Sequence, residues 1–157
     1  MKAEQFKAAG YLRDPITQIW RRPGFDGIDY SDGYETEIHL LSLVASTHDV
    51  SVFSPALREA CVDWASMYHL SAARANLLRP IAEQLVGDVL ELGAGCGAIT
   101  RFLGENGADV VAVEGSARRA AIAQARTCDL DNVAVVVDDI AQCPIDQKFD
   151  VVTLVGV

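Results

Sequence analysis

The sequence lacks any run of apolar residues long enough to cross a membrane. A transmembrane helix needs about 18 or more consecutive apolar residues, and the 157-residue chain contains no such run. The amino terminus, MKAEQFKAAGYLRD, also lacks the apolar stretch of a secretion signal. Both absences predict a chain without a membrane span.

Positive charge is also scarce. The chain has 13 Lys and Arg against 22 Asp and Glu, a net charge of −9. The basic residues are scattered, and Arg21–Arg22 and Arg118–Arg119 are no more than pairs. A nucleic-acid binder needs a basic footprint. The composition therefore predicts no nucleic-acid partner, and solubility explains the acidic excess.

The four cysteines do not pair in the sequence. Cys61, Cys96, Cys128 and Cys143 form no C-x-x-C motif and have no histidine at metal-ligand spacing. A disulfide framework would imply an oxidising compartment. The pattern predicts reduced thiols and no metal site, and reduced thiols favour a cytoplasmic location.

Two zones are visible along the chain. Residues 1–53 form an N-terminal extension that reads as mixed turns with one helix, over the stretch YETEIHLLSLVAS. The second zone is 54–157, and it begins with a helical lead-in, 54–86. There Ser54–Pro55 is a helix start signal, and Ala56, Ala60 and Trp64 share one face of a helix expected from about 55 to 67. Shorter helices are expected over 72–78 and 80–86, and Trp20 and Trp64 are expected in the core.

From residue 88 to 157, strands and helices alternate. The expected strands are 89–92, 110–113, 133–137 and 151–155, and the expected helices are 97–105 and 116–127. The strands are continuously apolar, which is typical of a parallel sheet covered on both faces. The fold class predicted for this part is α/β, a Rossmann-like doubly wound parallel sheet.

A glycine loop follows the first of these strands. Gly93, Gly95 and Gly97 allow positive φ and leave backbone N–H groups open to a ligand at the start of the helix. Together with Ala98, the first two also match the loose dinucleotide fingerprint. Glu114 lies 21 residues beyond Gly93, at the end of the second strand, where a carboxylate can accept ribose hydroxyl protons. The pattern indicates a cofactor that contains ribose.

Glu91 distinguishes among such cofactors. It lies two residues before Gly93, where a carboxylate repels a pyrophosphate but favours the sulfonium and ammonium of S-adenosylmethionine. Asp138–Asp139, after the third strand, is a further acidic position that could accept a bond from an adenine amino group. Three structural alternatives stay open. Glu91 could pair with Arg74 or Arg101, Glu114 could be a helix N-terminal acid, and the aspartates could be turn residues.

The stretches VLELGAGCGAIT, VVAVEGS, VVVDDIAQCP and FDVVTLVGV resemble the successive motifs of class I S-adenosylmethionine-dependent methyltransferases, over about residues 60–157. The preceding DWASMYHLSAARANLLRP resembles a segment of bacterial methyltransferase domains associated with cell-surface glycan glycosyltransferases. The family sheet has the strand order 3-2-1-4-5-7-6. The resemblance therefore implies a piece truncated after strand four, with the partial order 3-2-1-4.

The resemblance also implies roles for individual residues. An upstream lid would include Tyr68, His69 and Arg74, with His69 packed or capping a helix, and no catalytic base is identified. The implied cofactor-binding residues form three groups. The methionine moiety would be bound by Glu91, Gly93, Ala94 and Gly95. The ribose would be bound by Glu114 and Gly115, and the adenine by Asp139 and Ile140.

The predicted function is methyl transfer from S-adenosylmethionine to a small-molecule or glycan acceptor, by an enzyme of which this chain carries the cofactor-binding part. One alternative is a non-catalytic S-adenosylmethionine-binding module. Another is a nicotinamide-dependent oxidoreductase, against which Glu91 argues. The apolar strand 151–155 would form an open sheet edge, which invites self-association.

Overall fold

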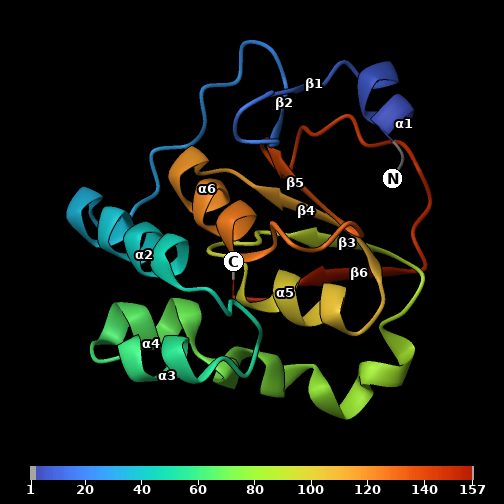
Figure 1. Cartoon of the computed structure of the whole chain (residues 1–157). Helices are drawn as coiled ribbons and strands as arrows, with labels where there is room; N and C mark the ends of the chain where they lie inside the picture. The colour runs from blue at the N-terminus through green and yellow to red at the C-terminus, as the bar shows by residue number, and fades with distance from the viewer. Residues whose placement is uncertain (1–2, 157) are drawn as a thin grey trace.

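The computed structural model describes residues 3–156, which form a six-stranded sheet with helices packed against it (Figure 1). The strand order is β1-β2-β5-β4-β3-β6. Only β1 and β2 are antiparallel, and every other neighbouring pair is parallel. The strands are β1 (Leu12–Arg13), β2 (Trp20–Arg21), β3 (Asp88–Leu92), β4 (Asp109–Glu114), β5 (Val133–Val137) and β6 (Val151–Leu154). The four strands predicted from apolar runs are β3 to β6, and their predicted relative order is confirmed.

Both faces of the sheet are covered over β4 and β5, as the continuous apolar strands predicted, whereas Val152 and Leu154 of β6 are exposed. On one face, Val110 and Ala112 pack in the cluster under α5 (Ala98–Glu105), while α6 (Ala117–Arg126) lies beside α5. On the other face, Val111 and Val113 pack against an N-terminal layer built around α1 (Ala3–Ala8), with Phe6, Tyr11 and Trp20. The α/β, Rossmann-like fold class is confirmed.

The expected single helix over 55–67 is wrong, because the chain forms two helices there. α3 (Pro55–Ala60) ends before Cys61, and α4 (Trp64–Leu70) begins after Asp63. The Asp63 carboxylate accepts a bond from the Ser66 N–H at 2.7 Å, and the Asp63 N–H donates to the Ser66 hydroxyl at 3.2 Å. This capping box starts a new helix and turns Trp64 outward, so that it is 79% exposed. The expectation of Trp64 in the core is therefore wrong, whereas Trp20 is buried as expected.

The rest of the lead-in is tighter than an α-helix. Where two short helices were expected, the chain forms the 3₁₀ helices η1 (Ala72–Leu77) and η2 (Arg79–Gln84). The helix predicted in the N-terminal extension is α2 (Tyr34–Ser46), which packs beside α6 (Figure 1). The same extension also contributes α1, β1 and β2, which were not predicted. Within residues 3–156, no helix has the length and apolarity that a membrane crossing requires.

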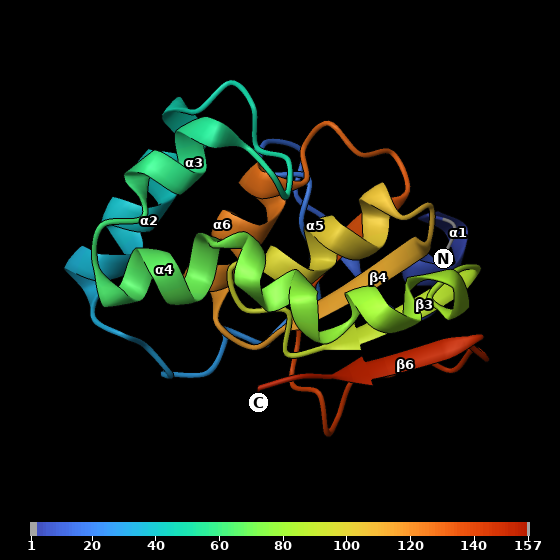
Figure 2. The same ribbon diagram turned by 90° about the horizontal axis from the view of Figure 1, so that it is seen from below.

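Strand β6 forms one edge of the sheet, beside β3 (Figure 2). Its side chains Val152 and Leu154 are 57% and 59% exposed, while Thr153 points inward and is buried. An exposed apolar edge is the feature on which the expected self-association depends. That association stays a prediction.

Candidate functional site: a cavity at the carboxyl ends of the parallel strands

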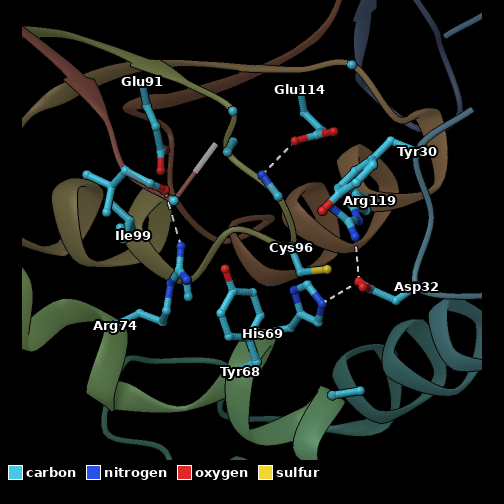
Figure 3. Close-up of a pocket in the computed structure, with 18 of the residues that line it drawn as sticks. Tyr30, Asp32, Tyr68, His69, Arg74, Glu91, Cys96, Ile99, Glu114 and Arg119 are labelled. Carbon is cyan, nitrogen blue, oxygen red and sulfur yellow. Dashed lines mark hydrogen bonds and ion pairs between the residues drawn. The ribbon is translucent and has the colours of Figure 1, made fainter. Parts of the chain in front are cut away.

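A cavity of about 830 Å³ opens at the carboxyl ends of the parallel strands (Figure 3). Ligands of open α/β sheets bind at this end of the strands. All eight predicted cofactor-binding residues line this cavity: Glu91, Gly93, Ala94, Gly95, Glu114, Gly115, Asp139 and Ile140. The structure thus brings together residues from the ends of β3, β4 and β5, and their roles toward a ligand stay a prediction.

The glycine loop forms an open backbone wall of the cavity. Gly93, Gly95 and Gly97 have φ angles of 73°, 58° and 81°, so the predicted positive φ is confirmed at all three. A Cβ added at Gly95 would meet no atom within 4 Å, whereas one at Gly97 would lie 2.8 Å from the Ala123 Cα. Gly97 therefore permits close packing of the loop on α6, and Gly95 leaves the backbone accessible from the cavity.

Glu114 supports this loop. Its side chain is only 5% exposed. One carboxylate oxygen accepts a bond from the Gly95 N–H at 2.7 Å, and the other accepts one from the Ser116 N–H at 2.7 Å. The alternative of a helix N-terminal acid is thus realised in part, since Ser116 is the N-cap of α6. Each carboxylate oxygen retains a second acceptor site that a ribose hydroxyl could use.

Glu91 is buried to the same degree but has no such partners. It is 4% exposed, and its Oε2 has no hydrogen-bond partner within residues 3–156. The alternative ion pairs are absent in this described part of the chain, because Arg101 binds Glu105 and Asp129, and Arg74 donates to the Val155 carbonyl at 3.3 Å.

This environment changes the acidity of Glu91. Burial raises the pKa of its carboxyl to about 8, and the negative charge of Glu114 acts in the same direction. Thr100 and the cation of Arg74 oppose this rise without cancelling it. A cationic ligand group would find here a buried carboxyl group whose Oε2 has no partner within residues 3–156.

The two aspartates after β5 have different roles. Asp138 is fully buried and accepts bonds from the Tyr11 hydroxyl at 2.6 Å and from the Arg22 Nε at 2.9 Å. The expectation that Asp138 serves as an acidic position for the ligand is therefore wrong, because its acceptors are used by the N-terminal layer. Asp139 does line the cavity, and its carboxylate also accepts the Ala141 N–H at 2.8 Å, as in a turn.

An N-terminal segment forms a wall of the cavity that sequence reasoning missed. Ile28, Tyr30 and Asp32 all line it, beside Thr36 of α2. The Ile28 N–H donates to the Gly115 carbonyl at 3.0 Å, which fixes this segment against the tip of β4. The segment is rich in Gly and Asp and carries only turn signals, so no local pattern could have placed it here.

Asp32 connects three elements around the cavity. It accepts a bond from the His69 Nε2 of α4 at 2.7 Å and forms an ion pair with Arg119 of α6 (Figure 3). Burial lowers the pKa of His69, although the Asp32 carboxylate opposes this. His69 is thus packed and hydrogen-bonded in the cavity wall, in agreement with the expectation for it.

Aromatic and cationic side chains of the predicted lid also face the cavity. Trp64 and Tyr68 stack with ring centroids 5.7 Å apart, and the Arg74 guanidinium lies 4.6 Å from the Tyr68 ring centroid. All three residues line the cavity. Tyr68 and Arg74 were predicted for a lid and Trp64 was not, and the role of these residues as a lid stays a prediction.

Comparison with known proteins finds similarity over part of the chain. Residues 89–157 match the family model of a methyltransferase domain. The ribosomal RNA small subunit methyltransferases A of Streptococcus gordonii and Streptococcus mutans are 40% and 36% identical to the chain, over 76 and 78 residues. These matches cover 46% and 47% of this chain, and 26% and 27% of the relatives. The predicted resemblance to class I S-adenosylmethionine-dependent methyltransferases is confirmed, and the chain spans about a quarter of the length of these curated relatives.

Two solved structures are also similar in part. The structure titled "DhpI-SAH complex structure" is 31% identical with a TM-score of 0.47, and the match covers 76% of this chain and 53% of that one. A coclaurine N-methyltransferase bound to N-methylheliamine and SAH is 20% identical with a TM-score of 0.49, over 78% of this chain and 42% of that one.

The prediction that the protein has no nucleic-acid partner is wrong. The curated relatives are named as methyltransferases of ribosomal RNA, so a net negative charge in this part of the sequence does not rule out such an acceptor. The physical reason is that the net charge of −9 averages over 157 residues. A nucleic acid contacts a local surface, which a total charge does not describe.

Proposed function

We propose that the cavity binds S-adenosylmethionine and that the chain is the cofactor-binding part of a methyltransferase. The proposal depends on one observation: Glu91 and Glu114 line a single cavity with the open backbone at Gly95, and within residues 3–156 the Glu91 Oε2 has no hydrogen-bond donor. A positively charged nucleoside with ribose hydroxyls complements this arrangement. A pyrophosphate in the same place would meet a buried carboxyl group.

Each part of the cofactor has a counterpart in the cavity. Glu91 would receive the ammonium group, and Arg74 would meet the carboxylate of the same methionine tail. Glu114 would accept the ribose hydroxyls through its remaining acceptor sites. Asp139 and Ile140 would contact the adenine. A cavity of about 830 Å³ is within the range of ligand pockets.

Methyl transfer asks mainly for alignment from the protein. The cofactor, when bound, supplies a methyl group activated by its sulfonium. The residues of the cavity would hold that group in line with an acceptor, and such positioning contributes several kcal/mol to catalysis. Residues Tyr68 and Trp64 of α4 would exclude water from the side opposite the strands.

The acceptor we propose is a small molecule or a glycan. Ribosomal RNA is a second candidate, which the names of the curated relatives favour. Transfer of a radioactive methyl group by the full protein separates the two, with ribosomal RNA in one arm and small-molecule and glycan extracts in the other. Incorporation into the RNA alone would contradict the first candidate.

Calorimetric titration tests the cofactor assignment directly. S-adenosylhomocysteine should bind and NAD should not, and Glu114→Ala should weaken binding by about 1–3 kcal/mol, since a charge-assisted bond is lost. Glu59→Ala, at an exposed position of α3, serves as the matched control and should bind as the unchanged protein does. Tight binding of NAD without binding of S-adenosylhomocysteine would overturn the proposal.

A further inference from the structure

We propose that Glu91 holds a proton in the ligand-free protein and loses it when the positively charged methionine tail binds, so that cofactor binding releases one proton. This inference rests on the proposed function, since it concerns the same ligand. It makes Glu91 a residue that selects for ligand charge. It also couples the affinity of the site to pH.

The first step is the isolation of the carboxyl group. Glu91 is 4% exposed, and Oε2 has no partner within the described residues. Glu91 pairs in register with Thr153 of β6, so the two side chains lie on the same face of the sheet. The hydroxyls of Thr153 and of Thr100 are likewise buried without a partner in the part of the chain that the structure describes. The surroundings within residues 3–156 therefore hold no cation in contact with Glu91 and leave it little exposed to water, and the Thr100 hydroxyl opposes the effect of burial only in part.

The second step concerns the charges that face Glu91. Arg74 of η1 is the cation whose charge favours the carboxylate form, and Glu114 of β4 is an anion that disfavours it. The Arg74 guanidinium makes its described hydrogen bond to the Val155 carbonyl and lies over the Tyr68 ring, so it does not neutralise Glu91 by direct contact. Burial is the largest influence and raises the pKa of Glu91 to about 8. At neutral pH the group is therefore mainly a neutral acid.

The third step is the effect of the ligand. An ammonium group placed against Glu91 stabilises the carboxylate, because opposite charges attract strongly where water is excluded. The O–H bond of the neutral acid breaks, the proton passes to the buffer, and the carboxylate accepts a hydrogen bond from the ammonium. 5′-Methylthioadenosine has the same nucleoside but no amino-acid tail, so it should bind without this release.

Proton linkage then fixes the pH dependence. Where Glu91 is protonated in the free protein and ionised in the complex, affinity for S-adenosylhomocysteine rises up to about tenfold for each pH unit. This rise should hold from about pH 6 to pH 7.5 and level off above pH 8, where the free protein has already lost the proton. Glu91→Gln cannot release a proton, and its affinity should be nearly flat over the same range.

The experiment is calorimetric titration of the full chain with S-adenosylhomocysteine at pH 7, in phosphate and in Tris, whose ionisation enthalpies differ. The expected result is release of about 0.9 proton per ligand bound, and none with 5′-methylthioadenosine. Glu83→Gln, at an exposed position of η2, should release as many protons as the unchanged protein. Glu91→Gln should release none while still binding 5′-methylthioadenosine, which also shows that it is folded.

The outcomes are distinct. Binding of S-adenosylhomocysteine without proton release overturns this inference and leaves the proposed function intact. Release that persists in Glu91→Gln assigns the proton to another group, such as His69 or the ligand's own amine, and also overturns the inference. Absence of any binding by S-adenosylhomocysteine overturns the proposed function, and this inference with it.

Discussion

The ends of β3 and β4 each present a buried glutamate to the same cavity, but the two side chains differ in the backbone hydrogen bonds that they accept. Glu114, at the end of β4, accepts the N–H groups of Gly95 and Ser116. Glu91, on β3, receives no hydrogen bond from the described residues at its Oε2. The two side chains are 5% and 4% exposed, so burial does not explain the contrast.

This difference indicates that Glu114 has a structural role, whereas Glu91 is available to bind a ligand. Two backbone donors fix the carboxylate of Glu114 and let it stabilise the loop and the start of α6 while facing the cavity. Glu91 contributes nothing comparable to the fold, since a buried polar group without a partner lowers stability. Retaining such a group is consistent with binding at this point.

The largest expected effect is on stability at alkaline pH. Because the pKa of Glu91 is raised to about 8 in the folded chain, the folded state keeps a proton that the unfolded state loses above about pH 4.5. Stability is therefore lost as pH rises from about 4.5 to 8. Glu91→Gln removes this penalty and should raise the free energy of unfolding at pH 8 by about 3–5 kcal/mol. Denaturant unfolding at pH 8 and pH 4 measures it, and an equal gain at both pH values would contradict the account.

The loop between the two glutamates gives the next largest effect. Gly97→Ala should destabilise the fold by about 3 kcal/mol, because the new methyl group would overlap the backbone of Ala123 and φ is 81° there. Gly95→Ala is the matched control, with a φ of 58° but open space around its Cα, and should cost about 1 kcal/mol. Thermal unfolding of both variants decides, and equal losses would show that packing on α6 is unimportant.

A smaller loss is expected at Glu114. Glu114→Gln replaces one of its two accepting oxygens by an amide NH₂, which leaves either the Gly95 or the Ser116 N–H without an acceptor. The free energy of unfolding at pH 7 should fall by about 2 kcal/mol. Urea denaturation measures this, with Glu59→Gln as the exposed control. If Glu114→Gln lowers the free energy of unfolding no more than Glu59→Gln does, Glu114 has no structural role in the loop.

The smallest effect distinguishes the two ends of the ligand. Arg74→Ala should weaken binding of S-adenosylhomocysteine by about 1 kcal/mol, through loss of the cation near its carboxylate. It should leave binding of 5′-methylthioadenosine unchanged, because that ligand lacks the carboxylate. Glu114→Ala should weaken both. If Arg74→Ala weakens the binding of both ligands equally, Arg74 does not contact the amino-acid tail of the ligand.

Much of the strand end of the site was predictable from the sequence. Apolar runs identify β3, β4 and β5, and a parallel sheet brings their carboxyl ends together, so residues immediately after each run must meet. For this reason Glu91, Gly95, Glu114 and Ile140 share one cavity, as expected. The rule depends only on local pattern and on one general property of parallel sheets.

The opposite wall and the side-chain directions could not be obtained in this way. Asp138 and Asp139 are neighbours in the sequence, but Asp138 points toward Tyr11, 127 residues away, and only Asp139 reaches the cavity. Trp64 matches a helical face in the sequence, but the capping box at Asp63 restarts the helix and exposes it. Contacts between distant segments, such as Ile28 with Gly115, leave no periodic signal.

The bonds from Tyr11 and Arg22 to Asp138 have a practical consequence for anyone who cuts this protein into smaller pieces. A gene fragment that begins at residue 89, where the family match begins, would lack both donors and leave an anionic group without its cation at the tip of β5. It would also expose to solvent the face of the sheet that carries Val111 and Val113. Such a fragment should accumulate in inclusion bodies. A longer fragment that runs from the N-terminal residues through β5 and Asp138 keeps the bonds that Asp138 accepts from Tyr11 and Arg22 and should stay in solution.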